Sequence, residues 1–441
     1  MQPCRPFQDA ELRELLPTEL VQCRDEGADV SGYETRVKEV LALEPGPERW
    51  RAAFELYEAL RALPVDAAQQ SLEPTEWEAL RASCEWVGLS TSAKTTPDRL
   101  LGAWLGRAAG CLLGKPVEGW TFEHIGELLD FVGEESIKDY FPPLPEDTPE
   151  RLRYPEILKP GPCLRGAVDG MARDDDMDYP ILGLDLMERK GLGFTTDDVG
   201  ASWLEHLPYH LTYTAERAAY RNLIQGRPAP ESATFWNPYR EWIGAQIRGD
   251  IFGWVSPGKP GRAAELAYRD ARLSHVRNGT YGEMFVAAAN AAALIVTDLN
   301  EVLDIAIAHV PPGSRFAELI GKCRAWHKEG LSWEDAAKRA RDEYGRHNWA
   351  HVLPNAALVA LALLYGDGDY ERTITCAVRG GWDTDCNGAT AGAICGAMQG
   401  AQRLPKPWVG PLGDTLHSAV AGYDPSSFRD LSARTGRLAE S

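Results

Sequence analysis

The chain contains 441 residues and carries a formal net charge of −19, so it is long enough for one large domain with an extension or for two domains. This acidic balance excludes broad binding to nucleic acids and to anionic membranes, because both depend on basic side chains that contact phosphates. The nine cysteines show no C-x-x-C pair, and the longest apolar run, 284–296, is too short to span a bilayer, so we expect a cytoplasmic protein without a disulfide framework.

The first part of the chain, residues 1–95, is predicted to be an acidic, helical extension. Apolar residues recur there at spacings of three and four, which is typical of amphipathic helices. The segments with this pattern are 34–43, 50–63 and 74–87. Because Pro and Gly interrupt the pattern between them, we expect separate short helices.

A polar stretch at 90–97 marks the predicted boundary of this extension. It ends in a Thr-Pro pair, and proline is favoured in the first turn of a helix. The predicted organisation is an extension at 1–95, a main domain at 96–425 and a C-terminal tail at 426–441.

Glycines recur at every fourth position near the start of the main domain. Gly106, Gly110 and Gly114 fall on one face of a predicted helix, which favours close packing against a second helix. Helical patterns continue to about residue 400, and 284–296 and 354–365 are apolar on nearly all faces, as buried helices are. Segment 133–170 is rich in Pro and Gly and is predicted to be a loop. We therefore expect an all-α fold, a compact multi-helix bundle with an N-terminal helical extension.

A cluster of acidic residues precedes one of the apolar helices near the C-terminus. Asp383, Asp385, Asn387 and Gly388 match the opening of an EF-hand loop, but the twelfth loop position is Ile394 and cannot supply the required carboxylate. Two interpretations remain: a helix that begins near Asn387 could be capped by these aspartates, or the aspartates could bind a divalent cation. Capping accounts well for one aspartate and poorly for two.

An earlier run, Asp174-Asp175-Asp176 with Asp178, leaves the same alternatives open. Most charge runs are solvated loops, and Asp178 could cap a helix that Pro180 opens. The two runs together favour a metal site, because a site for two ions needs about four or more carboxylates from separate segments. Carboxylates are preferred ligands of Mg²⁺, Mn²⁺ and Ca²⁺.

Other polar residues carry weaker patterns. Glu118, just past the glycine-rich helix, is a candidate general base, although an ordinary surface glutamate fits its spacing as well. Cys386 is either a ligand or a small buried side chain. His275, His309 and His351 are predicted to be structural, because they lack metal-ligand spacing.

Taken in order, these motifs resemble the ADP-ribosylglycohydrolase family, which includes the dinitrogenase reductase-activating glycohydrolases. Segment 106–118, G-R-A-A-G-C-L-L-G-K-P-V-E, is similar to the family's opening helix, G-x-x-x-G-D-x-L-G-x-P-x-E. Segment 174–177 is similar to its Thr-Asp-Asp-Thr metal motif, and 381–393 to its C-terminal G-G-D-T-D-T-N-A-x-x-A-G-A. The resemblance covers roughly 98–400.

The resemblance implies a metal-dependent hydrolase that cleaves an ADP-ribosyl N- or O-glycosidic bond. Two Mg²⁺ ions, or Mn²⁺, would hold the ribose hydroxyls while a water is activated, and one carboxylate would assist proton transfer. The implied metal ligands are Asp174, Asp175, Asp176, Asp383, Asp385 and Cys386. The implied catalytic residues are Glu118, Asp176 and Asp383. Asp174 and Cys386 stand where the family carries hydroxyl residues, and Cys111 replaces the helix aspartate.

The resemblance also implies a place for the substrate. Asn278, Gly279, Tyr281 and Gly282 lie where the family has a Gly-rich stretch that approaches the ADP-ribose phosphates. The implied partner is an ADP-ribosylated protein or a small ADP-ribosyl conjugate. The alternatives are hydrolysis of another ribosyl or glycosyl conjugate, and a catalytically idle fold that senses a ligand or acts as an interaction module.

Overall fold

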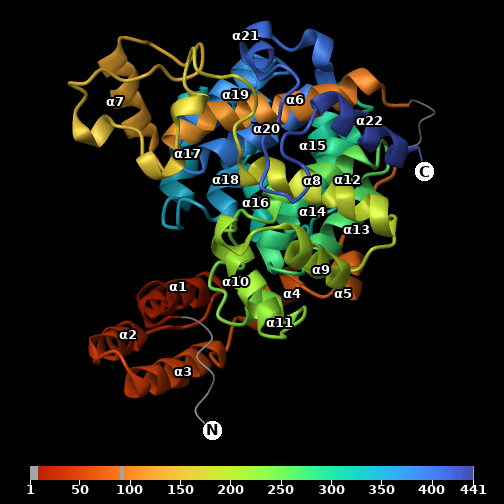
Figure 1. Cartoon of the computed structure of the whole chain (residues 1–441). Coiled ribbons are helices and arrows are strands. Elements are labelled where there is room, and N and C mark those ends of the chain that lie inside the picture. The colour runs from red at the N-terminus through yellow and green to blue at the C-terminus, as the bar shows by residue number, and fades with distance from the viewer. Residues whose placement is uncertain (1–7, 90–93, 441) are drawn as a thin grey trace.

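The computed structural model describes residues 8–89 and 94–440, and over these residues it is built from helices, with β-pairing limited to isolated bridges. The expected all-α fold is confirmed (Figure 1). The α-helices are α1 (Leu12–Asp25), α2 (Tyr33–Ala42), α3 (Pro47–Arg61), α4 (Ala67–Leu72), α5 (Trp77–Ser83), α6 (Pro97–Gly114), α7 (Phe122–Val132), α8 (Asp175–Lys190), α9 (Thr196–His206), α10 (Thr214–Ile224), α11 (Glu231–Thr234), α12 (Asp250–Trp254), α13 (Pro260–Ala271), α14 (Arg277–Ala293), α15 (Leu299–Ile307), α16 (Arg315–Lys328), α17 (Trp333–Tyr344), α18 (Val352–Gly366), α19 (Tyr370–Arg379), α20 (Thr384–Gln399), α21 (Lys406–Val409) and α22 (Phe428–Ala439). The 3-10 helices are η1 (Asp9–Glu11), η2 (Lys115–Val117), η3 (Glu150–Leu152), η4 (Glu156–Leu158), η5 (Gly161–Cys163), η6 (Tyr209–Leu211), η7 (Gln246–Arg248), η8 (Ala401–Arg403) and η9 (Gly410–Leu412).

Two helices that are distant in sequence form the centre of the fold. α6 and α20 touch backbone to backbone, because glycines of one face glycines of the other: a Cβ atom at Gly110 would lie 2.0 Å from the carbonyl oxygen of Gly388. The other facing pairs are Gly102 with Gly396 and Gly106 with Gly392, and Gly114 faces the backbone of Thr384. The predicted glycine face is therefore confirmed, and it brings the end of α6 to the start of α20.

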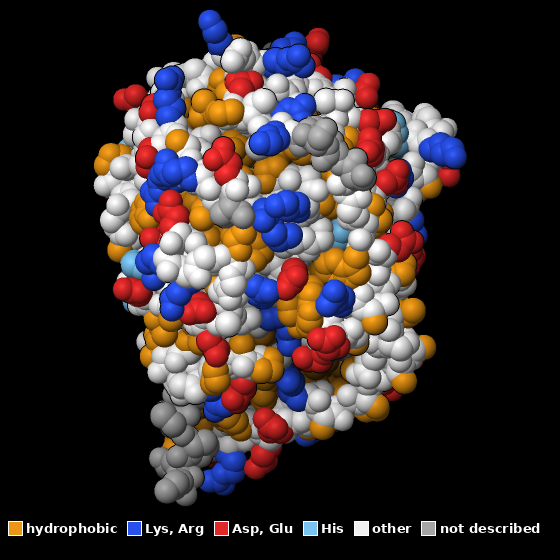
Figure 2. Space-filling view, turned by 90° about the vertical axis from the view of Figure 1, so that its right-hand side faces the viewer, with side chains coloured by type: hydrophobic (Ala, Val, Ile, Leu, Met, Phe, Trp, Pro, Cys, Tyr) orange, Lys and Arg blue, Asp and Glu red, His pale blue; other side chains and the backbone are white. Residues whose placement is uncertain are grey.

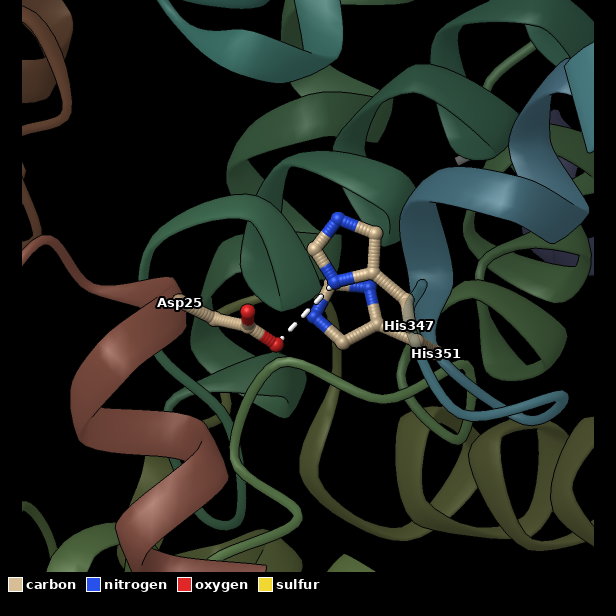
Figure 3. Close-up of side chains that lie close together, drawn as sticks. All are labelled: Asp25, His347 and His351. Carbon is tan, nitrogen blue, oxygen red and sulfur yellow. Dashed lines mark hydrogen bonds and ion pairs between the residues drawn. The ribbon is translucent and has the colours of Figure 1, made fainter. Parts of the chain in front are cut away.

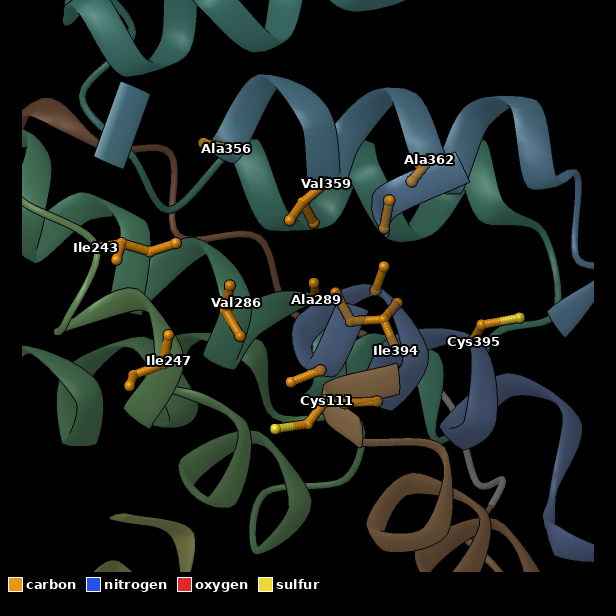
Figure 4. Packing of buried hydrophobic residues seen from close by; sticks show 14 of the residues in the cluster. Cys111, Ile243, Ile247, Val286, Ala289, Ala356, Val359, Ala362, Ile394 and Cys395 are labelled. Carbon is orange, nitrogen blue, oxygen red and sulfur yellow. The ribbon is translucent and has the colours of Figure 1, made fainter. Parts of the chain in front are cut away.

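The helices around this pair are apolar on all sides. Every residue of α14 and α18 is buried, which confirms the prediction of buried helices, although α14 begins at Arg277 rather than near Met284. Figure 4 shows Cys111 of α6, Ile394 of α20 and Ala289 of α14 in one cluster, with Val359 of α18 facing them. This core gives the site a rigid base.

The N-terminal helices form a small unit with its own core. α1, α2 and α3 pack together and lie beside α10 at the lower left of Figure 1. Buried ion pairs attach the unit to the main body: Arg240 contacts Glu19 at 2.9 Å and Glu26 at 2.7 Å. The stacked rings of Tyr57 and Trp236, 4.0 Å between centroids, add an aromatic contact. Residues 90–93, within the predicted boundary, lie outside the described part of the chain.

The remaining segments cover the bundle. Residues 133–170 contain only η3, η4 and η5, in agreement with the predicted loop. The segment expected to be a tail instead forms α22, which packs against α6 and α8. Basic and acidic side chains are interspersed on the face shown in Figure 2. Among the described residues, no helix has both the length and the apolarity needed to cross a bilayer.

Candidate metal centre

The first acidic run lies at the start of α8, in a position that differs from the prediction. The helix begins at Asp175 rather than at Pro180, and its cap is the Asp174 side chain, which accepts a hydrogen bond from the Asp176 backbone at 3.0 Å. Pro180 therefore lies inside the helix and has no N–H to donate to the carbonyl of Asp176. The guanidinium of Arg107 donates to that carbonyl instead, at 2.8 Å.

Arg107 is a buried cation directly beneath the acidic run. It donates to Asp176 Oδ1 and to Asp250 Oδ2, both at 2.7 Å, and to the Ile247 carbonyl at 2.6 Å. All of its partners are charged or polar, which is the condition for a stable buried charge. Because one oxygen of Asp176 is held by Arg107, the other is directed to the Cys111 side, 3.9 Å from Sγ.

A second cation, Lys115, lies at the other side of the run. Its ammonium contacts Asp174 Oδ2 and is 3.4 Å from the Arg173 carbonyl. Burial alone would raise the pKa of Asp174, but Lys115 holds it below its ordinary value. The charge that Asp174 adds, compared with the hydroxyl residue of the resembling motif, is therefore balanced by Lys115.

Asp178 faces away from these residues. It accepts hydrogen bonds from Ser418 and from the Ala419 backbone at 2.8 Å each, and it pairs with Arg173 at 2.7 Å. These contacts fix the loop before α22 to the start of α8. Asp178 is thus a structural residue and not the helix cap that the sequence allowed.

The second acidic run surrounds the start of α20. This helix begins at Thr384, three residues earlier than expected, so Asp385 lies in its first turn and Asp383 precedes it without making a side-chain cap. Trp382 adopts a positive φ of 65°, a conformation that tertiary contacts must hold in a residue with a side chain. Its N–H donates to the Trp120 carbonyl at 2.7 Å, and its carbonyl accepts from the Gly119 N–H at 2.8 Å.

Asn355 of α18 holds this turn from the other side. Its Oδ1 accepts from the Asp383 backbone at 3.2 Å and from Asn387 Nδ2 at 2.8 Å. One oxygen of each aspartate, Oδ1 of Asp383 and Oδ1 of Asp385, is buried without a hydrogen-bond partner. Buried carboxylate oxygens without partners are rare, and a bound cation is one arrangement that satisfies them.

The two runs converge into one cluster. Ligand atoms of Cys111, Asp174, Asp176 and Asp385 lie within 4.8 Å of one another, and Asp385 also belongs to a group with Asp383 and Cys386 that meets the same limit. Burial and the surrounding carboxylates raise the pKa of Asp175, Asp176 and Asp383 well above the ordinary value, and that of Asp385 to about 6. Positive charge in addition to Arg107 and Lys115 would lower these pKa values and favour the ionised carboxylates.

Glu118 lies at the edge of this cluster, four residues after the end of α6. Burial, followed by Asp385 and Asp174, raises the pKa of Glu118 well above its ordinary value. The backbone pairing of Gly119 with Trp382 ties this segment to the second acidic run. The predicted proton-transfer residue is thus beside the predicted ligands.

These residues fit a site for divalent cations. The oxygen-rich donor set and the unpartnered oxygens of Asp383 and Asp385 suit hard ions such as Mg²⁺. Cys386 is partly buried and Cys111 is buried, and both offer sulfur, a poorer donor for such ions. The carboxylates in the two close groups are those of Asp174, Asp176, Asp383 and Asp385, and Asp175 lies outside both groups.

Comparison with known proteins gives the family of the chain. The sequence model of the ADP-ribosylglycohydrolase family matches residues 92–436. The chain belongs to the ADP-ribosylglycohydrolase family. A similar solved structure, an ADP-ribosylglycohydrolase-related protein complex, is 19% identical with a TM-score of 0.46, and the match covers 78% of this chain and 98% of that chain. No curated protein matches the chain. Family membership confirms the resemblance and places the chain among hydrolases.

The residues that the family resemblance assigned to the substrate lie in the first turns of α14, where all of them are buried. Asn278 Nδ2 donates a hydrogen bond to Glu241 Oε2 at 2.7 Å, and Asn278 Oδ1 accepts one from the Phe316 backbone N–H at 3.0 Å. The Tyr281 hydroxyl donates to the Pro74 carbonyl at 2.6 Å, so it contacts the N-terminal extension. Gly279 and Gly282 allow close packing against α14's neighbours. Substrate contact by these four residues stays a prediction.

Sequence reasoning missed several residues that shape this family site. Arg107, Lys115, Asp250 and Asn355 were not singled out as site residues. A detectable pattern existed for Arg107, the charged residue in the apolar, glycine-rich stretch 100–114. Such a residue must meet buried carboxylates or break the core.

Proposed function

We propose that the chain is an Mg²⁺-dependent hydrolase that cleaves an ADP-ribosyl N- or O-glycosidic bond. The observation that carries this proposal is the convergence of carboxylates from α8 and α20, with buried oxygens of Asp383 and Asp385 that lack a partner. Family membership supplies the reaction class. Mn²⁺ is the alternative ion, because it accepts the same oxygen ligands.

Each acidic residue has a distinct role in the proposal. Asp175, Asp176, Asp383 and Asp385 would hold two ions, with Asp176 oriented by Arg107 and Asp383 by Asn355. Bound Mg²⁺ would polarise and orient the ribose hydroxyls and a water. Asp176 and Asp383, one from each run, would contact the reacting region through these ions.

Glu118 is the proposed proton-transfer residue. Burial, followed by the nearby carboxylates, raises the pKa of Glu118 above its ordinary value, which is the direction that a general acid needs. In glycoside hydrolysis a proton must reach the leaving oxygen or nitrogen or leave the attacking water. The proposed substrate is an ADP-ribosylated protein or a small ADP-ribosyl conjugate.

A direct assay tests this proposal. The full chain, dialysed free of divalent ions and then given Mg²⁺, is incubated with peptides ADP-ribosylated on Arg or Ser, and released ADP-ribose is measured by chromatography. We expect release that needs Mg²⁺ and that falls by at least about 100-fold in Asp385→Asn. Asp298→Asn is the matched control, because Asp298 caps α15 and Asn keeps that cap. Release that is equal in Asp385→Asn and the wild type would refute the proposal.

A further inference from the structure

A second group of potential metal ligands, separate from the acidic cluster, lies where the N-terminal unit meets the main body. Asp25 ends α1, and His347 and His351 lie on the segment that leads into α18 (Figure 3). Asp25 Oδ2 is 3.0 Å from His347 Nδ1, and the two imidazole rings are stacked with centroids 4.4 Å apart. One ligand atom from each residue lies within 4.8 Å of the others.

An ordinary ion pair does not explain this group. The Asp25–His347 contact uses Nδ1 of His347 and does not involve Nε2 of His351, which is buried without a hydrogen-bond partner. Nδ1 of His351 accepts from the Leu353 backbone at 3.2 Å, so Nε2 is the nitrogen of that ring left for a further ligand. Burial lowers the pKa of His351 well below its ordinary value, which keeps the ring neutral, as a metal ligand must be.

The geometry points to a transition-metal site: we propose that Asp25, His347 and His351 bind one ion of the Zn²⁺ class. Two imidazoles and a carboxylate suit Zn²⁺ better than Mg²⁺, which prefers oxygen ligands only. Two atoms each 2.0–2.1 Å from one tetrahedral ion are about 3.4 Å apart, so the 3.0 Å between Asp25 and His347 needs little change.

A cavity beside the group leaves room for a fourth ligand. Its volume is about 170 Å³, and Asp25 and His351 form part of its wall together with Gln22, Trp242 and Asn348. A water molecule in this space would complete a tetrahedral arrangement. If Nε2 of His351 binds the ion, the ring proton moves to Nδ1, and Nδ1 no longer accepts the hydrogen bond from the Leu353 N–H. The protein thus loses one capping hydrogen bond and gains three coordination bonds.

The ion would act as a clamp between two parts of the chain. It would join the end of α1 to the start of α18, whose sequence positions differ by more than three hundred residues. Asn355 Nδ2 donates to the His351 carbonyl at 2.9 Å, and Asn355 Oδ1 accepts from the Asp383 backbone. The same segment therefore holds both the clamp and the turn of the acidic cluster, which makes His351 and Asn355 positioning residues for that turn.

Metal titration of the full chain tests the clamp separately from the acidic cluster. Protein stripped of metal is saturated with Mg²⁺ and titrated with Zn²⁺ by calorimetry and with Co²⁺ by visible absorption, which reports imidazole coordination. The variants are His347→Asn, Asp25→Asn and His351→Asn, in which Asn keeps an acceptor for the Leu353 N–H. His417→Asn is the matched control, since His417 pairs with Asp424 at 2.8 Å on the surface without a second histidine.

We expect one Zn²⁺ bound by the wild type, by His417→Asn and by Asp385→Asn, with affinity lowered by about 100-fold or more in the Asp25, His347 and His351 variants. Asp25→Asn leaves both rings intact and serves as the reference if a histidine variant unfolds. Equal Zn²⁺ affinity in the wild type and these variants would overturn the proposal, and so would loss of Zn²⁺ binding in Asp385→Asn. Failure of hydrolysis with an intact Zn²⁺ site would contradict only the proposed function.

Discussion

Arg107 and Asp176 form an ion pair of 2.7 Å in which the exposed fractions of the side chains are 0% and 1%. The same guanidinium pairs with Asp250, which is also fully buried. This contact fixes one oxygen of Asp176, and the other lies on the side of the acidic cluster, where it accepts from Cys111 Sγ at 3.9 Å. The helix α6 thus supplies both the glycine face and the cation that orients a ligand.

The Arg107→Met variant is expected to lower the free energy of unfolding by about 3–5 kcal/mol, because two buried carboxylates lose their partner. Urea denaturation of the metal-free protein measures this change. Arg189→Met is the control, since Arg189, whose side chain is 36% exposed, makes an i,i+4 pair with Asp185 near the surface. We expect Arg189→Met to lower the free energy of unfolding by less than about 1 kcal/mol. Similar losses in both variants would contradict the assigned role of Arg107.

Gly110→Ala is expected to disrupt the contact between α6 and α20, because the added Cβ would lie 2.0 Å from the Gly388 carbonyl oxygen. Overpacking of this kind should lower the free energy of unfolding by about 1–3 kcal/mol. Gly321→Ala, in α16 with no atom within 4 Å of its Cβ, should instead stabilise the protein by about 0.5–1 kcal/mol. Thermal unfolding distinguishes the two, and a tolerated Gly110→Ala would mean that the helices can separate.

The features visible in the sequence are those carried by local patterns. Glycine at every fourth position predicted that α6 packs against another helix, and the two acidic runs lie in one cluster as expected. The predicted first residues of α8 and α20 were wrong, because tertiary contacts decide where these helices begin. α8 begins before Pro180 because Arg107 takes the carbonyl that proline leaves free, and α20 begins at Thr384, whose hydroxyl donates to the Gly114 carbonyl at 2.8 Å.

His351 shows the other limit of sequence reasoning. It was predicted to be structural, and its four-residue spacing from His347 lies on a turn rather than on a helix face. The third residue of the group, Asp25, comes from the N-terminal extension. Only the docking of that extension, through ion pairs such as Arg240–Glu19, brings the three side chains together.

The double variant Asp383→Asn with Asp385→Asn is expected to lose Mg²⁺ binding and keep its fold. Removing like charges that are buried together relieves repulsion, so the metal-free variant should be at least as stable as the metal-free wild type. Calorimetry gives the Mg²⁺ stoichiometry, and circular dichroism gives the fold. Asp298→Asn should bind Mg²⁺ as the wild type does. Unchanged stoichiometry in the double variant would contradict the ligand assignment.

Mg²⁺ binding at pH 6 is expected to release protons. Burial, with Asp174, raises the pKa of Asp385 to about 6 from an ordinary value of 3.8, so the group is partly protonated there and must ionise to bind the ion. The raised pKa also means that the metal-free protein loses stability from this group as pH rises from about 4 through 6. Titrations in buffers with different ionisation enthalpies measure the release, and heats independent of the buffer would contradict it.

Cys386→Thr is expected to keep or increase the affinity for Mg²⁺, because a hydroxyl oxygen suits a hard ion better than sulfur does. Cys376→Thr, at a partly buried cysteine of α19, is the control for the effect of the substitution itself. Calorimetric titration compares the two. A large loss of affinity confined to Cys386→Thr would show that the sulfur or its packing is needed.

The most direct test of the central claim is a thermal-shift titration of the wild type with ADP-ribose, in the presence of Mg²⁺ and after dialysis that removes it. A ligand bound only by the folded state at about 100 times its dissociation constant stabilises by about 2.7 kcal/mol. We predict a shift with Mg²⁺, and none without Mg²⁺ or in the variant with both Asp383→Asn and Asp385→Asn. An ADP-ribose shift that persists without Mg²⁺ and in that variant, or no shift while Mg²⁺ itself still binds, would contradict a metal-dependent ADP-ribosyl site at this cluster.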